Sequence, residues 1–363
     1  IKSSSQTTGA SGPHTFAYTY RLDGSMASIT YPAGRVVNYE HDTAGRVSSI
    51  TGYASVLSYA DHGALSRIVY ANNFAEQICF NSRLQPIRVS VKAGLAAACV
   101  ANDTDIAGAD LDLRFGYNSP STSNNNGNVL EQTITAPITA GGALKLKQTY
   151  GYDPLNRISS AAETVVSGAT GGAWQRVFDA DARGNTWVTA STQALHMAVP
   201  TAASQYEAAT NRLTKTAANL NIGYDAAGFM TQHPAVGTMT YDAEGRLLSV
   251  TGTGVTATFS YDGNGRRVKK DLGGGQVVTY VYNAAGELAV EYGGVVAAGD
   301  VGRRYRSEDH LGSTRLEMDA TKVTARHDYF PFGEELVSAD YNGRRDLVTG
   351  YPGAAGAFPQ KFT

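Results

Sequence analysis

Cysteine is scarce in this chain, the net charge is small, and no long hydrophobic run is present. The 363 residues include two cysteines, and 30 Lys and Arg residues nearly balance 32 Asp and Glu residues, so that the formal net charge is −2. This balance gives no general attraction to nucleic acid, and we expect no nucleic-acid partner. The longest apolar stretch, residues 95–101, is far too short to cross a bilayer, so we expect no membrane-spanning helix.

The two cysteines also lack the spacing of a metal site. Cys79 and Cys99 lie 20 residues apart, whereas structural zinc sites draw on closely spaced Cys or His pairs. In an oxidising compartment the two thiols can form a disulfide if their Cα atoms come within about 7 Å. The alternative is that both are small, buried hydrophobic side chains. Both interpretations stay open at this point, and no metal or cofactor site is predicted.

Glycine and tyrosine are abundant, with 40 and 21 residues respectively. Glycine suits tight turns and tyrosine is enriched in β-strands, so this composition favours strands and turns over helices. With 42% hydrophobic and 17% charged residues, the chain has enough apolar material for a packed core. We therefore expect an ordered, all-β protein.

One phrase, Tyr-Asp-x-x-Gly, often followed by Arg, recurs along the chain. Its Asp or Asn positions in the second half are 225, 242, 262 and 283, which are 17, 20 and 21 residues apart. Weaker copies begin earlier, at Tyr39 and Tyr152. Repetition at a nearly constant period predicts a repeat array rather than a compact enzyme, because each repeat unit packs mainly on its neighbours.

Each copy has the pattern of a β-hairpin. In residues 238–251 an alternating strand leads into Asp242-Ala243-Glu244-Gly245, and a second alternating strand follows. An Asp side chain at the start of a turn accepts hydrogen bonds from backbone N–H groups two residues later, and Gly supplies a positive φ. The predicted turn residues are Asp42, Gly45, Asp153, Asp225, Gly228, Asp242, Gly245, Asp262, Gly265 and Gly286.

The repeat pattern weakens in two segments, residues 94–142 and 161–222. Within the second segment, an Ala- and Thr-rich stretch suggests one short helix over Ser204–Asn211. No segment has the composition of an interdomain linker. We therefore expect one continuous hairpin array over residues 1–300, which residues 301–363 continue with different motifs.

The last part of the chain contains two further motifs. They are Glu308-Asp309-His310-Leu311-Gly312-Ser313-Thr314-Arg315 and Asp328-Tyr329-Phe330-Pro331-Phe332-Gly333-Glu334. Together with six copies of the repeat phrase, these motifs closely resemble the bacterial rearrangement-hotspot (RHS) or YD-repeat family, where they open the RHS-associated core. That family includes the C component of insecticidal ABC toxins, polymorphic toxins and the animal teneurins.

The resemblance implies a strip of hairpins that winds into a spiral sheet or hollow shell and encloses or presents a C-terminal effector. Twisted strands make a long strip curl, which agrees with this expectation. The resemblance also implies a bacterial protein that is secreted or displayed at the cell surface. In the family the core continues beyond a phrase like Lys361-Phe362-Thr363 towards a self-cleavage site and a toxin. We therefore expect a non-enzymatic, internal piece of a longer polypeptide, whose partner is its own C-terminal effector or a flanking part of that polypeptide.

Asp309, His310 and Arg315 bring an acid, a base and a cation together within seven residues. A catalytic interpretation requires a nucleophile, and Ser313 lacks the Gly-x-Ser-x-Gly elbow that exposes such a serine. The favoured interpretation is a turn at Gly312, with Asp309 and Arg315 pairing or capping the strand ends.

Two basic clusters and two tryptophans have both a structural and a binding interpretation. The clusters are Arg266, Arg267, Lys269 and Lys270, and Arg303, Arg304 and Arg306. They suit polyanions or acidic glycans, although a solvated hairpin surface is favoured. Trp174 and Trp187 suit sugar rings, although core packing is the default. The alternatives to a shell are therefore an adhesion or carbohydrate-binding module, and a self-assembling fibre whose strand edges pair with other copies.

Overall fold

The computed structural model describes residues 1–100, 104–118, 124–170, 174–196, 198–252, 254–293, 302–336 and 345–351. The chain forms two compact units. The first unit comprises Ile1–Tyr39, Ala180–Val188 and Leu195–Val301, and the second comprises Glu40–Asp179, Thr189–Ala194 and Gly302–Thr363. Each unit therefore combines segments that are distant in sequence. The division into an array over 1–300 and a core segment over 301–363 follows sequence motifs and stays a prediction.

Strands make up nearly all of the regular structure. In chain order they are β1 (Ser3–Thr8), β2 (Ser11–Tyr20), β3 (Met26–Thr30), β4 (Val36–His41), β5 (Val47–Ile50), β6 (Ala54–Tyr59), β7 (Leu65–Tyr70), β8 (Phe74–Phe80), β9 (Pro86–Ala93), β10 (Leu111–Gly116), β11 (Glu131–Pro137), β12 (Ala143–Tyr152), β13 (Ile158–Ser167), β14 (Trp174–Ala180), β15 (Thr186–Ser191), β16 (Tyr206–Glu207), β17 (Arg212–Leu213), β18 (Gly223–Tyr224), β19 (Met230–His233), β20 (Gly237–Tyr241), β21 (Leu247–Gly252), β22 (Val255–Tyr261), β23 (Arg267–Asp271), β24 (Val277–Tyr282), β25 (Leu288–Gly293), β26 (Tyr305–Glu308), β27 (Thr314–Met318) and β28 (Val323–Arg326). Two short 3₁₀ helices, η1 (Ala203–Gln205) and η2 (Arg345–Leu347), complete them.

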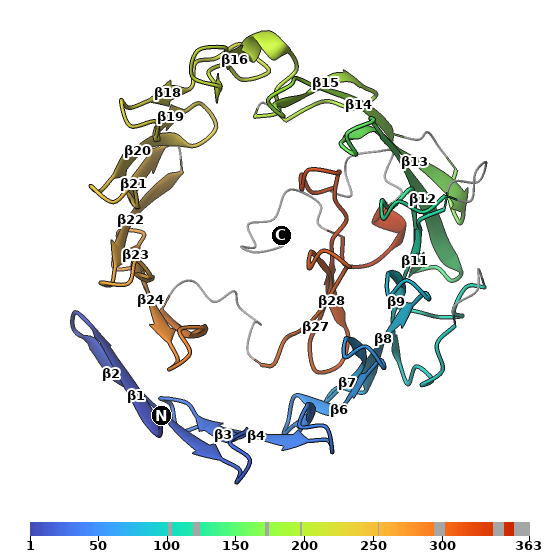
Figure 1. Ribbon diagram of the computed structural model, residues 1–363, viewed down its shortest axis with the longest axis vertical. Helices are drawn as coiled ribbons and strands as arrows, with labels where there is room; N and C mark the ends of the chain where they lie inside the picture. Colours follow the sequence, from blue (N-terminus) through green and yellow to red (C-terminus); the bar gives the residue numbers. More distant parts are fainter. Residues whose placement is uncertain are drawn as a thin grey trace. The chain divides into compact units, whose positions relative to one another are not determined.

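The strands pair with their neighbours in the chain as antiparallel ladders (Figure 1). In the second unit, β5 to β14 follow one another in chain order, and β26 to β28 form a separate three-stranded sheet. In the first unit, β18 to β25 form an eight-stranded sheet. The described ranges hold no α-helix, and none of their helices has the length and apolar character needed to cross a membrane. The prediction of an all-β array of hairpins is confirmed.

One face of the β7–β12 sheet carries the main core of the second unit. Because side chains alternate along a strand, every second residue points to this face, as Val91, Leu113 and Leu146 do on β9, β10 and β12. Leu316 and Met318 of β27 are fully buried against this cluster. The small C-terminal sheet therefore covers this face of the larger one, and Figure 1 draws β27 and β28 alongside it.

In the first unit, the N-terminal hairpin β1–β2 joins the β24–β25 hairpin through side chains. The Gln6 amide donates to the Tyr280 carbonyl at 2.7 Å and accepts from the Tyr282 N–H at 3.0 Å. Pairing between β23 and β24 stops at Thr279, so Gln6 satisfies backbone groups that the ladder leaves open. Phe16 packs with Val281 in a small core beside this joint.

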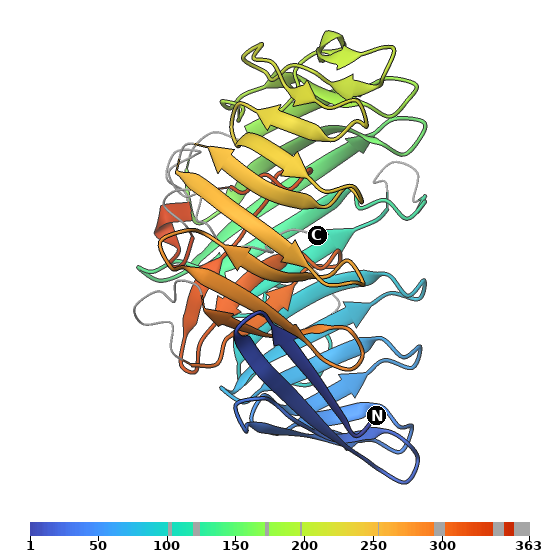
Figure 2. The same ribbon diagram turned by 90° about the vertical axis from the view of Figure 1, so that its left-hand side faces the viewer.

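The turns of the repeat phrase share one backbone form. In the Asp242 turn, the Gly245 N–H donates to the Asp242 carbonyl, and the Asp242 N–H donates to the Arg246 carbonyl, both at 3.0 Å. Gly245 has a φ of 78°, so this is a type I turn followed by a left-handed residue, and a bulge ends the ladder beside it. These turns alternate with other connections, so they lie along one edge of the sheet, as Figure 2 shows for β6–β7 and β8–β9.

The segments with a weak repeat pattern still contribute strands. β10 and β11 lie within residues 94–142, and β14 and β15 within 161–222. The predicted helix over Ser204–Asn211 is wrong, because this stretch forms only η1 and the β16–β17 hairpin. The Gln205 side chain accepts from Thr201 N–H and donates to the Thr216 carbonyl, and Asn211 adopts a φ of 60°. These local bonds replace those of a helix.

We predict that Gly265→Ala destabilises the first unit whereas Gly263→Ala, in the same turn, does not. A Cβ meets nothing within 4 Å at either position, but only Gly265 has a positive φ, of 78°. The left-handed conformation should cost Gly265→Ala about 1–2 kcal/mol of the free energy of unfolding. Gly263→Ala should leave stability unchanged or slightly raised, because it restricts the unfolded chain. Thermal and urea unfolding measure both, and equal losses would contradict the assigned turn.

Candidate functional site

The Asp of the repeat phrase holds both the turn and the Arg that follows it. One carboxylate oxygen of Asp242 accepts from the backbone N–H groups of Glu244 and Arg246, each at 2.9 Å, and the other accepts from the Arg246 Nε at 2.6 Å. The Asp42 and Asp153 turns have the same three bonds. The backbone N–H of the Arg is the largest influence, and it lowers the pKa of each of these carboxyls below the usual value.

The Tyr of each repeat bonds to the repeat before it. The Tyr261 hydroxyl donates to the Leu247 carbonyl at 2.8 Å, two residues beyond Gly245. The same offset from the residue that ends the previous turn recurs, at 2.8–2.9 Å, for the following pairs: Tyr59 with Val47, Tyr117 with Pro86, Tyr152 with Val129, Tyr206 with Thr186, Tyr224 with Leu213, Tyr241 with Met230, and Tyr282 with Arg267. In these hairpins the hydroxyl thus ties one hairpin to its predecessor.

The Arg of a repeat reaches forward to the Tyr of the next. The Arg246 guanidinium lies 5.2 Å from the centre of the Tyr261 ring, and Arg46 lies 4.6 Å from that of Tyr59. Arg266 has the same relation to Tyr282, at 5.5 Å. Each contact is a cation–π interaction. Together, the Asp, Arg and Tyr make one linkage, which we call the Tyr-Asp-Arg interlock, because Asp orients Arg, Arg covers the next Tyr, and that Tyr bonds back.

Not every predicted turn residue takes part in the full interlock. Asp225 accepts from the backbone N–H groups of Gly228 and Phe229, and its turn has Phe229 at the Arg position. Gly286 ends a turn that begins with Asn283 and has Glu287 after it. Asp262 and Gly265 form the regular turn before Arg266. Gly45 likewise ends the Asp42 turn.

The two C-terminal motifs repeat the same turn. Asp309 N–H donates to the Ser313 carbonyl and Gly312 N–H donates to the Asp309 carbonyl, as in the repeat phrase. In the second motif, Phe330 takes the Asp position and Gly333, with a φ of 88°, takes the Gly position, with Pro331 between them. The Tyr329 hydroxyl donates to the Thr314 carbonyl at 2.8 Å, again two residues beyond the Gly of the preceding turn. The motifs are therefore further members of the hairpin series.

A buried network of charges attaches the C-terminal segments to the β13 strand. Arg345 of η2 donates to both carboxylate oxygens of Glu163 on β13, at 3.1 and 2.7 Å, and to Asp328 at 2.8 Å. Asp328 also accepts from Arg315 and from the Tyr351 hydroxyl. Burial raises the pKa of Asp328, but Arg345 and Arg315 outweigh it and bring that pKa to about 2. A buried charge without a partner is strongly destabilising. The C-terminal segments must therefore dock where these charges pair with one another.

A second contact between the sheet and the C-terminal segment is partly aromatic. Trp174 is fully buried, and its ring centre lies 4.8 Å from that of Phe330. The Arg176 guanidinium lies 3.4 Å from the centre of the same Phe330 ring and donates to Glu334 at 2.6 Å. Trp174 therefore belongs to the core, and Trp187 is half-buried.

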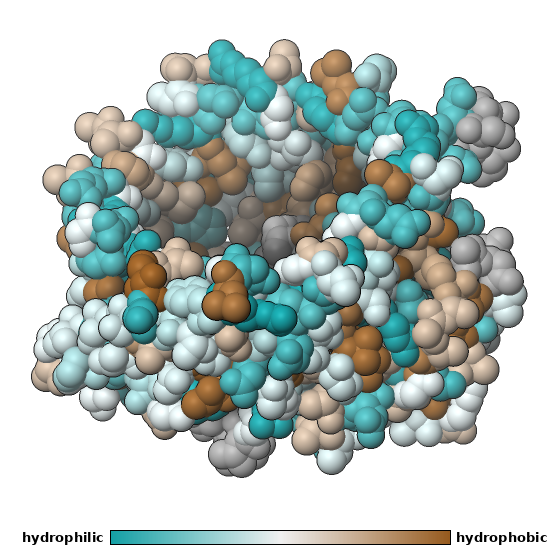
Figure 3. All heavy atoms as spheres, turned by 60° about the horizontal axis from the view of Figure 1, so that its bottom comes forward, coloured by the Kyte–Doolittle hydropathy of each residue, from teal (hydrophilic) through white to brown (hydrophobic). Residues whose placement is uncertain are grey.

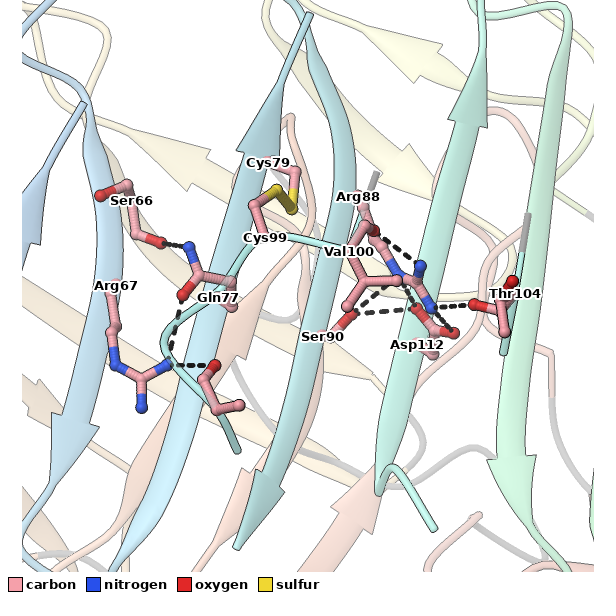
Figure 4. The surroundings of a disulfide bond; sticks show 11 residues. Ser66, Arg67, Gln77, Cys79, Arg88, Ser90, Cys99, Val100, Thr104 and Asp112 are labelled. Carbon is pink, nitrogen blue, oxygen red and sulfur yellow. Dashed lines mark hydrogen bonds and ion pairs between the residues drawn. A yellow bond between two sulfur atoms is a disulfide. The ribbon is translucent and has the colours of Figure 1, made fainter. Parts of the chain in front are cut away.

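The disulfide candidates lie on the opposite face of the second unit's sheet (Figure 4). Cys79 of β8 is bonded to Cys99 in the loop after β9, with the two Cα atoms 5.8 Å apart. Arg67 donates to the Leu95 carbonyl of this loop at 2.6 Å, and Arg88 donates to the Val100 carbonyl at 2.7 Å. These contacts fasten the loop over β7 to β10. That the bond forms in the protein stays a proposal.

The two basic clusters make contacts within their own units. Lys269 pairs with Asp271 at 3.1 Å, and Arg306 pairs with Glu317 at 3.4 Å. Arg304 donates to the Thr324 hydroxyl at 3.0 Å. On the face drawn in Figure 3, hydrophobic residues are scattered among hydrophilic ones instead of forming one patch.

The residues that sequence reasoning missed are those of the buried charge network. Glu163 lies on a strand with a weak repeat pattern, and Arg345 follows the second C-terminal motif. The available indication was the motif around Asp328, whose only use in the sequence was as a mark of the family resemblance. A charge on an apolar strand, such as Glu163 on β13, is the signal that points to a buried partner.

We predict that acid weakens the second unit between about pH 4 and pH 2 through Asp328. Its pKa in the folded protein, about 2, is below the ordinary 3.8, so its contribution is complete above the ordinary value and is lost as pH falls through the folded value. Asp328→Asn should reduce the free energy of unfolding at pH 7 by about 3–5 kcal/mol, because buried cations lose their partner.

The measurement is Trp fluorescence during unfolding at a series of pH values, since Trp174 reports on this contact. The matched control is Asp346→Asn, whose exposed side chain follows Arg345. The control should keep the wild-type acid dependence, and Asp328→Asn should show a smaller one in this window. An unchanged acid profile in Asp328→Asn would count against the network's role.

We also predict that the oxidised chain yields a peptide linking Cys79 to Cys99. The closed loop spans 20 residues, so reduction should lower the free energy of unfolding by about 3 kcal/mol. Peptide mass spectrometry without reductant detects the link, and unfolding with and without reductant measures its effect. The double variant Cys79→Ala with Cys99→Ala should be insensitive to reductant. Two freely alkylated cysteines in the denatured, unreduced chain would exclude the bond.

Known proteins share parts of this sequence and this fold. Residues 241–275, which contain two of the turns described above, match the family model described as RHS Repeat. No curated protein sequence matches the chain. Among solved structures, the chain is similar to a Tc holotoxin pore of Photorhabdus luminescens carrying a TccC3 mutation, with a TM-score of 0.54 and 15% identity over 89% of this chain and 18% of that one.

Two crystal structures, of TcdB2-TccC3 and of TcdB2-TccC3-TEV, each give a TM-score of 0.55 at 15% identity. The similarity covers 89% and 93% of this chain respectively, and 18% of the other chain in both. The chain thus spans about a fifth of the length of these structures and shares their fold. Residues 241–275 therefore carry an RHS repeat.

Proposed function

We propose that this chain is a non-enzymatic structural segment of a β-sheet wall in a secreted or surface-exposed bacterial RHS protein. The wall encloses or presents a C-terminal effector. The observation that carries this proposal is the Tyr-Asp-Arg interlock, whose full set of contacts is present at Asp242, Arg246 and Tyr261 in the first unit and at Asp42, Arg46 and Tyr59 in the second. Such a linkage makes an extended, continuous sheet. The Tyr, Asp and Arg side chains of the linkage join successive repeats and do not serve to bind or transform a substrate.

A sheet of this kind separates two spaces by simple physical means. Each strand inside the ladder has its backbone N–H and C=O groups paired on both sides, so it offers no free edge to another polypeptide. The buried charges at Asp328 and Glu163 hold the C-terminal segments on the sheet, because separating them would leave charges without partners in an apolar setting. An effector that follows these segments would start from a fixed position on the wall.

The similar solved structures support an effector as partner. Their printed names describe assemblies of TcdB2 with TccC3, and one also includes Cdc42. Because this chain spans 18% of the length of those chains, the effector, its enclosure and its secretion are proposals for this protein.

The adhesion alternative relied on exposed aromatic residues, and Trp174, one of its two tryptophans, is fully buried. The fibre alternative relied on open strand edges. Nothing in the described residues favours either over the wall. The fibre predicts filaments of the purified chain, and the adhesion module predicts saturable binding on a glycan array.

We predict that electron microscopy of the natural gene product shows a hollow particle with density inside it. Limited proteolysis should leave the effector intact in the wild type and in Gly263→Ala, and should cleave it faster in a variant with Gly245→Ala and Gly265→Ala, since both glycines have a positive φ of 78°. Filaments formed by the purified chain, or an effector cleaved equally fast in all three proteins, would contradict enclosure.

A further inference from the structure

One buried carboxyl of the second unit lies in the apolar core without a cationic partner. Glu76 of β8 stands opposite Val91 of β9 in the ladder, on the face that carries the core, and it is 5% exposed. The buried carboxyl of Glu163 is paired with Arg345, whereas no Lys, Arg or His among the described residues forms an ion pair with Glu76. An isolated carboxylate is costly in such a place.

The polar groups that face Glu76 come from β7 and from β26 of the C-terminal sheet. The Tyr70 hydroxyl of β7 donates to the Glu76 Oε2 at 2.9 Å. From β26, the buried Ser307 hydroxyl and the exposed Glu308 carboxylate face the same group. The Arg306 guanidinium on this strand pairs with another carboxylate instead. In the described part of the chain, Glu76 is thus surrounded by hydroxyls, a further acid and apolar side chains.

Tyr70 links Glu76 to the edge of β26 through a single hydroxyl. The Tyr70 oxygen lies 2.9 Å from the Glu76 Oε2 and 2.9 Å from the Arg306 carbonyl oxygen. Burial, with Glu76 adding to it, raises the pKa of Tyr70, so the hydroxyl keeps its proton. One proton cannot be donated to two acceptors fully. If Glu76 is protonated, it donates to the Tyr70 oxygen and Tyr70 donates to Arg306, so that all three groups are satisfied.

The ionised form leaves this contact incomplete. A Glu76 carboxylate accepts the Tyr70 proton, which leaves the Arg306 carbonyl without that donor and keeps a charge in the core. Burial is the largest influence on Glu76 and raises its pKa to about 7, with Glu308 adding to this effect and the Tyr70 and Ser307 hydroxyls opposing it. The hydrogen-bond geometry and the pKa therefore both favour neutral Glu76 in the folded chain.

We propose that Glu76 is a proton-dependent clasp of the C-terminal sheet: neutral Glu76 holds β26 on the β7–β8 hairpin through Tyr70, and its ionisation, with loss of the proton to solvent, loosens that contact. The clasp acts within the second unit and does not depend on the proposed wall function. Its response to pH is opposite to that of the Asp328 network, which acid weakens.

The expected pH dependence follows from the direction of the pKa shift. The folded value of about 7 is above the ordinary 4.5, so the contribution of Glu76 is complete below about pH 4.5 and is lost as pH rises to about 7. Local opening of β26 and β27 should become easier over this range. Their amide protection against hydrogen exchange, corrected for intrinsic rates, should fall about a hundredfold from about pH 5 to about pH 8.

Glu76→Gln tests the clasp, because its neutral amide donates to the Tyr70 oxygen at every pH. This variant should keep the protection of β26 and β27 at pH 8. The matched control is Glu131→Gln on β11, whose carboxylate is partly exposed and pairs with Lys147. The control should lose protection with rising pH as the wild type does. An equal loss in the wild type and in Glu76→Gln would overturn the proposal.

Infrared spectroscopy gives a second, direct readout of the proton. At about pH 6, where exposed carboxyls are ionised, the wild type should show a protonated-carboxyl band that Glu76→Gln lacks. Tyr70→Phe removes a donor to the carboxylate, so this band should persist to a higher pH than in the wild type. Identical bands in the wild type and Glu76→Gln would show that Glu76 is ionised and would exclude the clasp. A band that titrates in Tyr70→Phe as in the wild type would contradict the link through Tyr70.

Discussion

The bond from each Tyr hydroxyl to a carbonyl of the previous hairpin is the interaction on which the rest of this structure depends. Strand pairing alone fixes neighbours within a sheet, but it leaves the register between successive hairpins to side-chain packing. The Tyr bond always reaches the residue two beyond the end of the previous turn, as in Tyr261 to Leu247 and Tyr59 to Val47. It therefore sets the same register wherever a Tyr precedes the turn, whereas the turns that begin at Asp42, Asn81 and Asp181 have His41, Phe80 and Ala180 at this position.

The two C-terminal motifs belong structurally to this series of hairpins. In sequence they look like a separate signature, but the Asp309 and Phe330 turns have the backbone bonds of the repeat, and Tyr329 makes the repeat's bond to the preceding hairpin. What distinguishes them is their environment. Asp328 and Arg345 are buried in a charged network against the larger sheet, whereas the paired Asp242 and Arg246 side chains of an ordinary repeat are partly exposed. The chain thus uses one local structure both to extend a sheet and to cover it.

The sequence predicted the local structure better than the long-range contacts. Alternation and the Asp and Gly positions correctly indicated hairpins, because these patterns act over a few residues, and the composition correctly indicated an all-β fold. The short helix over Ser204–Asn211 was wrong, because the Gln205 side chain forms bonds that no propensity describes. The network joining Glu163 to Arg345 was missed, since these residues are 182 positions apart and only the folded chain brings them together. The direction of the Tyr bond was missed for the same reason.

The fixed offset of the Tyr bond has a consequence for how such chains change in length. A hairpin inserted or deleted as a whole unit brings its own Tyr, Asp and Arg, so the hairpins on either side can join in the register they had before. An insertion of a few residues inside a strand instead displaces the carbonyl that the next Tyr must reach. Genes of this architecture are therefore expected to grow and shrink by whole repeats of about twenty residues, with smaller insertions confined to the connections that carry no Tyr bond.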